Sequence, residues 1–188
     1  MAKVKLNPIV DQVHGALGEL VFRYVDGRTV ISRRAEPTGD PTPAQQDQRA
    51  RFRDAAFYGR TVMADPDDRA FYEAIATQRK QPVFSVIVGD FLNPPVVDAI
   101  DADAYTGTPG DPVVVRAHDD VEVTGVTVML ADDTGTVLES GPATLDEWRW
   151  RYEAQTEVTA GTVVTITAVA TDRPANTGAL SEEVTVPA

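Results

Sequence analysis

The feature that most constrains the fold is a change of hydrophobic period at Asn93-Pro94-Pro95. Before these residues apolar side chains recur at helical spacing, whereas after them they alternate with a period of two, which is typical of strands. Two successive prolines remove two backbone donors and favour an extended link. We therefore predict an α+β domain of residues 1–94, made of a hairpin and short helices, followed by an all-β domain of residues 95–188.

The second half predicts an immunoglobulin-like β-sandwich. Short alternating segments are separated by turns rich in Pro, Gly and Asp, and seven such strands in about 95 residues are typical of this fold. We expect this half to fold by itself. The predicted strands are 96–100, 113–117, 121–130, 136–138, 148–154, 162–170 and 182–186.

Two of these strands predict where the core lies. In the strand 162–170, one set of alternating residues should face the core. In the strand 148–154, Trp148, Trp150 and Tyr152 share one face, and at least one tryptophan should fill the space between the sheets. The predicted core set is Val164, Ile166, Ala168 and Ala170.

The first half begins with a predicted β-hairpin. Residues 20–25 place Leu20, Phe22 and Tyr24 on one face, and Asp26-Gly27 is a favoured two-residue type I′ turn before a returning strand. An isolated hairpin is marginally stable in water, so this one needs something to pack on. We expect residues 1–94 not to behave as a monomer by themselves.

Helices should follow the hairpin. Thr42 and Gln45 form a capping-box pattern around Pro43, which suits the first helical position. The segment Asp65-Pro66-Asp67-Asp68 should end this helix and cap a second one. Residues 82–92 fit either a strand or a short third helix.

Charge is distributed unevenly along the chain. The formal net charge is -12, yet residues 1–94 hold 13 basic and 12 acidic side chains, whereas residues 95–188 hold four basic and 17 acidic ones. Such asymmetry indicates either a solubilising acidic surface or a chain that meets copies of itself head to tail.

The sequence offers little catalytic chemistry. It has no cysteine, only two histidines, and no nucleophile elbow, P-loop or zinc-protease motif. We predict that the protein is not an enzyme and assign no catalytic residue, cofactor or metal ligand. Carboxylates do gather near the start of the sandwich and in its loops, but their spacing matches no calcium-binding motif. They are Asp98, Asp101, Asp103, Asp119, Asp120, Asp132, Asp133 and Asp172.

Arginine and aromatic residues interleave in the first half. Arginine and aromatic side chains are favoured at protein interfaces, and the same combination occurs in nucleic-acid-binding proteins, which are usually far more basic than this half. We predict an interface and keep an ordinary surface or a nucleic-acid contact as alternatives. The predicted interface residues are Phe22, Arg23, Tyr24, Arg28, Arg33, Arg34, Arg49 and Phe52.

An ordered set of motifs carries a family resemblance over about half of the chain. The motifs are Gly15-Ala-Leu-Gly18, Val21-Phe-Arg23, Asp26-Gly-Arg28, Arg33-Arg34, Pro41-Thr-Pro-Ala-Gln-Gln46 and Arg49-Ala-Arg-Phe52. This half resembles a group of uncharacterised bacterial and phage-associated proteins with a G-x-x-G hairpin and an N-P-x-T-x-x-Q-x-x-x-R-x-x-F helix entry. Here Asp40 replaces the usual asparagine, and the loop before Thr42 is one residue shorter. The resemblance implies no enzyme and a structural role in particles or surface assemblies.

The second half carries a separate resemblance. The segment 161–172 and Asn176-Thr-Gly178 are similar to the last strands of bacterial immunoglobulin-like repeats of surface proteins. This resemblance bears on the fold and not on the function.

Three functional hypotheses follow. The first is a self-assembling structural subunit of a filament or phage-like particle, with head-to-tail contacts between copies. The second is a surface module that binds a carbohydrate or receptor through Trp148 and Trp150, which an exposed tryptophan would favour. The third is a nucleic-acid-associated protein. We see neither a membrane-spanning segment nor a signal peptide, so we expect cytoplasmic synthesis with release in an extracellular assembly or particle.

Overall fold

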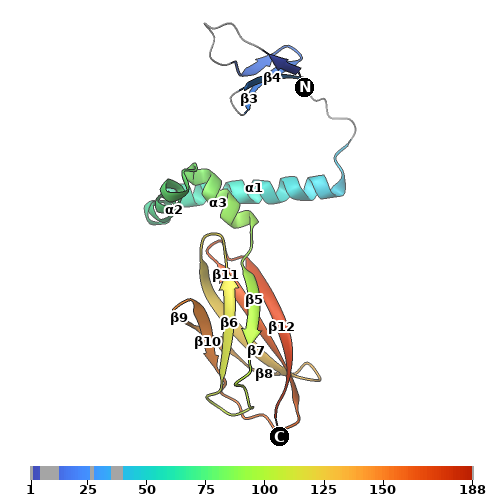
Figure 1. The fold of residues 1–188 in the computed structure, drawn as a ribbon, viewed down its shortest axis with the longest axis vertical. Coiled ribbons are helices and arrows are strands. Elements are labelled where there is room, and N and C mark those ends of the chain that lie inside the picture. Colours follow the sequence, from blue (N-terminus) through green and yellow to red (C-terminus); the bar gives the residue numbers. More distant parts are fainter. Residues whose placement is uncertain (1, 5–12, 26–27, 35–39, 188) are drawn as a thin grey trace. The chain divides into compact units, whose positions relative to one another are not determined.

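The computed structural model describes residues 2–4, 13–25, 28–34 and 40–187 (Figure 1). The chain forms two compact units, Met1–Gln46 and Asp47–Ala188. The division falls in the first turn of α1 (Pro43–Ala64), so the helical segment and the β-rich second half belong to one unit. The domain boundary predicted after residue 94 stays a prediction.

The N-terminal unit contains a four-stranded antiparallel sheet in the order β1-β4-β3-β2. The predicted hairpin is present as β3 (Leu20–Val25) and β4 (Arg28–Arg33), with Val25 opposite Arg28, while its turn at Asp26-Gly27 lies outside the described residues. The flanking strands were not predicted, because three residues each are too few for a clear alternation. They are β1 (Ala2–Val4) and β2 (Gly15–Leu17).

Capping explains where the first two helices begin. The Thr42 backbone N–H donates to Gln45 Oε1 at 3.1 Å, and the Gln45 N–H donates to Thr42 Oγ1 at 3.3 Å, so the predicted capping box is confirmed. Asp65 Oδ1 accepts hydrogen bonds from the next two N–H groups inside α2 (Pro66–Arg79), at 2.9 and 3.1 Å. The predicted helix stop and cap at Asp65 is therefore also confirmed.

The ambiguous segment 82–92 is a helix, α3 (Val83–Leu92). Val86 and Ile87 are buried against side chains of the other helices. A helix buried in this way is apolar on several sides, so its sequence does not show the single apolar face that marks an amphipathic helix. Gly59 allows this packing, because a Cβ there would lie 2.8 Å from the Phe84 ring. Among the described residues, no helix is both long enough and apolar enough to cross a membrane.

The second half of the chain consists of two antiparallel four-stranded sheets, in the orders β5-β6-β10-β9 and β12-β11-β7-β8. All seven predicted strands are present, together with the short strand β9, which the sequence did not reveal. The strands are β5 (Val96–Asp101), β6 (Pro112–His118), β7 (Val123–Asp132), β8 (Val137–Pro142), β9 (Thr144–Asp146), β10 (Arg149–Glu153), β11 (Val163–Asp172) and β12 (Thr177–Thr185).

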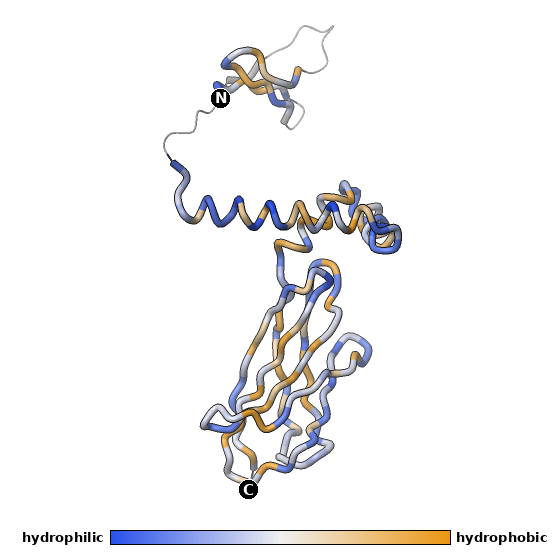
Figure 2. Tube along the Cα trace, turned by 180° about the vertical axis from the view of Figure 1, so that it is seen from behind, coloured by the Kyte–Doolittle hydropathy of each residue, from blue (hydrophilic) through white to orange (hydrophobic). Residues whose placement is uncertain are grey.

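The two sheets enclose one hydrophobic core, which gives this half its sandwich-like build. The four residues predicted to face the core from β11 are fully buried, so that prediction is confirmed. Figure 2 shows hydrophobic stretches along the strands of this half. The last strand begins at Thr177, five residues earlier than predicted, because only residues 173–176 turn the chain between β11 and β12.

Candidate functional site

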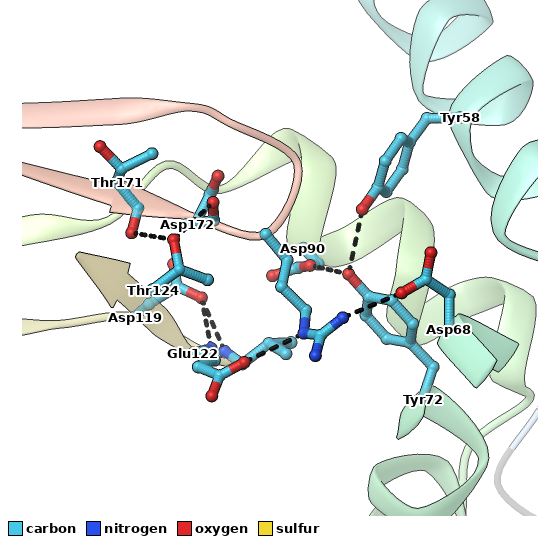
Figure 3. A network of polar contacts seen from close by, with 11 residues as sticks. Tyr58, Asp68, Tyr72, Asp90, Asp119, Glu122, Thr124, Thr171 and Asp172 are labelled. Carbon is cyan, nitrogen blue, oxygen red and sulfur yellow. Dashed lines mark hydrogen bonds and ion pairs between the residues drawn. The ribbon is translucent and has the colours of Figure 1, made fainter. Parts of the chain in front are cut away.

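A buried carboxylate lies where the helices meet the sandwich. Asp90, near the end of α3, is 0% exposed, and the Tyr72 hydroxyl of α2 donates a hydrogen bond to its Oδ2 (Figure 3). The Tyr58 and Tyr72 hydroxyl oxygens are 3.3 Å apart, which continues the chain of hydrogen bonds to α1. Burial raises the pKa of Asp90 to about 7, and burial also raises the pKa of Tyr72 far above its ordinary range. A polar chain therefore connects all three helices.

Two loop carboxylates from the sandwich lie beside Asp90. Asp119 and Asp120 follow β6, and one oxygen from each lies within 4.8 Å of the others and of an Asp90 oxygen. Asp119 Oδ2 accepts hydrogen bonds from the backbone N–H groups of Val121 at 2.8 Å and Glu122 at 3.0 Å. The loop backbone thereby fixes the Asp119 carboxylate next to the helix.

Arg173 joins the helices to the sandwich at the same junction. Its Nη1 lies 3.0 Å from Asp68 Oδ1 on α2, and its Nε lies 3.0 Å from Glu122 Oε2 in the loop before β7 (Figure 3). Its guanidinium carbon also lies 3.7 Å from the centroid of the Phe71 ring. These contacts combine a two-carboxylate bridge with a cation–π interaction, which a lysine could not reproduce.

The loop between β11 and β12 completes the junction. The Asn176 amide group donates to Asp172 Oδ2 at 2.8 Å and to the backbone carbonyl of Phe91 in α3 at 3.2 Å. Asp172 is 2% exposed, and burial is the main cause that raises its pKa. The helices are therefore held against the sandwich by contacts from two of its loops.

One face of the N-terminal sheet gathers its largest apolar side chains. Residues directly opposite each other in an antiparallel pair share a face, and the pairs Leu17↔Leu20 and Phe22↔Ile31 therefore place four apolar side chains together. Tyr24 and Arg33 belong to this face by the same register. Leu17 is 71% exposed, Leu20 40% and Tyr24 47%, while Phe22 and Ile31 are half-buried.

The structure divides the eight predicted interface residues among four places. Phe22, Tyr24 and Arg33 lie on the apolar face, whereas Arg23 and Arg28 lie on the opposite face of the same sheet. Arg34 follows β4, with its backbone N–H donating to the Glu19 carbonyl. Arg49 and Phe52 are exposed on α1, in the other compact unit. Leu17, Leu20 and Ile31 were not among the predicted interface residues, because their sheet partners are defined only by the three-dimensional register.

The two tryptophans have different environments. Trp150 is 8% exposed and belongs to the core, so the prediction that one tryptophan fills the sandwich is confirmed and its side chain is not available to a ligand. Trp148 precedes β10 and is 59% exposed. The guanidinium carbon of Arg149 lies 4.2 Å from the centroid of the Trp148 ring. It lines a depression of about 400 Å³ together with Asp101, Asp103 and Arg116.

Asp90 and Arg173 were not singled out from the sequence. A signal for Asp90 exists, because an acidic residue interrupts the apolar run Val83-Phe-Ser-Val-Ile-Val-Gly-Asp-Phe-Leu92 and must find a partner when the helix is buried. Arg173 gives no local signal, since its two carboxylate partners lie 105 and 51 residues away in the chain.

Comparisons with known proteins give no family. No protein-family model and no curated protein sequence matches the chain. Among solved structures, an engineered protein is similar at 32% identity and a TM-score of 0.34, over 48% of this chain and 20% of that one. A conjugative transposon lipoprotein from Bacteroides eggerthii is similar at 13% identity and a TM-score of 0.28, over 48% of this chain and 94% of that one. This chain therefore spans about a fifth of the engineered protein, and TM-scores this low support no argument about function.

Proposed function

We propose that this protein is a non-enzymatic structural subunit that associates with copies of itself through its N-terminal sheet. The observation that carries the proposal is the partly exposed apolar face of that sheet. Leu17, Leu20 and Tyr24 are exposed there, and both hydrophobic core clusters found among the described residues lie in the other unit. A sheet with one apolar face gains stability when a second layer covers it.

Charge favours another copy of the chain as the covering partner. The first half supplies arginines on both faces of the sheet and along α1, whereas residues 95–188 hold 17 acidic side chains against four basic ones. Contacts between unlike halves are heterologous, and such contacts make rings or open filaments rather than closed dimers. Exposed arginine–carboxylate pairs contribute only about 0–1 kcal/mol each, so they would set the register while the apolar face supplies most of the affinity.

We further propose that the sandwich has immunoglobulin-like topology. Lettered in chain order, its sheets read A-B-E-D and G-F-C-C′, which is the strand order of that fold with one added edge strand. In the assembly, this acidic domain would project from the contacts made by the N-terminal sheet or lie against a neighbouring copy. That arrangement fits a filament or a component of a phage-like particle.

Sedimentation velocity of the full chain over a range of micromolar concentrations tests the proposal. We expect concentration-dependent association that Leu17→Glu weakens strongly and Phe22→Asp abolishes. The matched control is Leu145→Glu, because Leu145 is also an exposed leucine in a short strand, at 54% exposure against 71% for Leu17, but lies in the sandwich. Added salt should slow association without abolishing it.

Two results would overturn the assembly proposal. One is a monomer at every concentration with the N-terminal sheet folded, shown by protection of its amide hydrogens from exchange. The other is association that Leu145→Glu disrupts and Leu17→Glu leaves intact, which would place the contact in the sandwich.

A second candidate function rests on Trp148. An exposed tryptophan beside charged side chains in a shallow depression is suited to stacking on a sugar ring while polar groups bind its hydroxyls. Binding of a polysaccharide should change the tryptophan fluorescence of the wild type and be lost in Trp148→Ala. Unchanged fluorescence across a panel of charged and neutral polysaccharides would contradict this candidate.

A further inference from the structure

We propose that Asp90, Asp119 and Asp120 form a calcium-binding site between α3 and the loop that follows β6. One oxygen from each carboxylate lies within 4.8 Å of the other two. Calcium binds oxygen at about 2.3–2.6 Å, so two ligands of one ion can be separated by up to about 5 Å. The three side chains are therefore close enough to share a single ion without a rearrangement of the backbone.

A buried carboxylate oxygen without a hydrogen-bond partner supports a cation site here. Asp90 is 0% exposed, and Tyr72 donates only to its Oδ2. Its Oδ1 is buried and, among the described residues, has no hydrogen-bond partner, and the same is true of Asp119 Oδ1. Leaving such oxygens unpaired in the interior is costly, so each needs a proton, a water or a cation.

The basic side chains of the junction do not neutralise this cluster. Arg173 forms its ion pairs with Asp68 and Glu122, and Arg79 donates to the backbone carbonyl of Asp120 rather than to its carboxylate. Within the described parts of the chain, no ion pair involves Asp90, Asp119 or Asp120. Three carboxylates this close repel one another strongly in a partly buried place, and a divalent cation would convert that repulsion into attraction.

Calcium fits this donor set better than the other common cations. The ligands are oxygens only, which excludes the sulfur and imidazole donors that zinc and copper prefer. Asp120 is exposed, so waters can complete the six to eight oxygens that calcium takes. The bound ion would tie the end of α3 to the sandwich, and this role is independent of the proposed assembly.

Metal titrations of the full chain, freed of metal with a chelator, test the site. Terbium is a luminescent substitute for calcium, and nearby tyrosines such as Tyr72 can sensitise it. We expect sensitised terbium emission that calcium displaces. We also expect an upward shift of the unfolding midpoint by roughly 5–10 °C at a calcium concentration about 100 times Kd. Magnesium should give a smaller shift at the same concentration.

Three charge-matched variants make the test specific. Asp90→Asn keeps an acceptor for Tyr72, and Asp120→Asn changes an exposed residue, so both should fold and both should bind calcium at least ten-fold more weakly. Asp133→Asn removes the same charge from an exposed loop of the sandwich and should bind like the wild type. The proposal is overturned if millimolar calcium gives no shift in the wild type. It is also overturned if all three variants retain the shift, because binding would then belong to the general acidic surface.

Discussion

The sandwich and the N-terminal sheet are both built from antiparallel strands, but they differ in what covers them. In the sandwich two sheets face each other, and residues such as Val128 and Ile166 are 0% exposed. In the N-terminal sheet Leu17 is 71% exposed, and Thr29, at 3% exposure, is the one buried side chain among those described. Strand pairing satisfies the backbone in both regions, whereas burial of apolar area requires a second layer.

Truncation of an isoleucine in each region should give the largest contrast. Ile166→Ala should lower the unfolding free energy of the Asp47–Ala188 unit by about 2–5 kcal/mol, because it opens a cavity in a packed core. Ile31→Ala, at a half-buried position of the N-terminal sheet, should leave this unfolding unchanged and weaken association instead. Denaturant titrations followed by tryptophan fluorescence report on the sandwich, since both tryptophans lie there. Equal losses for the two variants would show that the regions unfold as one.

Two glycine substitutions test how closely Pro95, between α3 and β5, approaches the last strand. A Cβ on Gly178 would lie 1.8 Å from the Pro95 carbonyl oxygen, so Gly178→Ala should cost about 1–3 kcal/mol by forcing the backbone apart. Gly125→Ala is the control, because no atom lies within 4 Å of its added Cβ. Thermal unfolding measures both, and a Gly178→Ala protein as stable as the control would contradict the close approach of Pro95 to β12.

Arg173 tests how firmly the helices are held on the sandwich. Arg173→Ala should lower the unfolding free energy by about 1–2 kcal/mol, since it removes two ion pairs and a cation–π contact. Arg173→Lys should restore only part of this, because an ammonium group lacks the planar fork. Arg151→Ala removes an arginine whose one ion pair with the described residues is to exposed Glu153, and it should have almost no effect. Chemical denaturation with and without salt compares the three, and full rescue by lysine would argue for simple charge neutralisation.

The smallest expected effect is a pH dependence at Asp111. Hydrogen bonds from the Thr108 N–H, the Thr106 N–H and the Thr106 hydroxyl to Oδ2 hold the pKa of Asp111 below its ordinary value. A carboxyl group with a lowered folded-state pKa stabilises the fold above its unfolded-state pKa of about 3.9, and this contribution is lost as the pH falls through the folded-state value. Asp111→Asn should therefore lower the melting temperature by a few degrees at pH 7, and the difference from wild type should shrink below about pH 4. If the difference in melting temperature between Asp111→Asn and the wild type did not change with pH, the loss of stability would come from altered packing or hydrogen bonding and not from the lost charge.

Local signals allowed much of the fold to be predicted from the sequence. Thr42 and Gln45 mark the start of α1 because a capping box uses residues three apart, and the alternation in β11 identifies its buried face. Segment 82–92 could not be assigned, because a short helix buried on several sides has no polar stripe to reveal its period. The three-residue strands β1, β2 and β9 are too short to alternate visibly.

The candidate sites were harder to predict, because they depend on contacts between distant segments. Alternation along β3 places Arg23 and Phe22 on opposite faces of the N-terminal sheet, and only the register shows which residues of the neighbouring strands join each of them. Asp90 acquires its role only when α3 brings it to Asp119, 29 positions further along the chain. Composition alone gives no information on such a pairing.

The course of the chain through the sandwich has a mechanical consequence. The chain enters along β5 at the end next to the helices, and β12 leads it out at the opposite end (Figure 1). A pulling force between α1 and the end of β12 would therefore run along the strands. The hydrogen bonds that β5 and β12 make with their neighbours lie perpendicular to that force and would be loaded together, in shear, rather than opened one after another. As a link under tension, the sandwich would resist extension far better along its strands than across them.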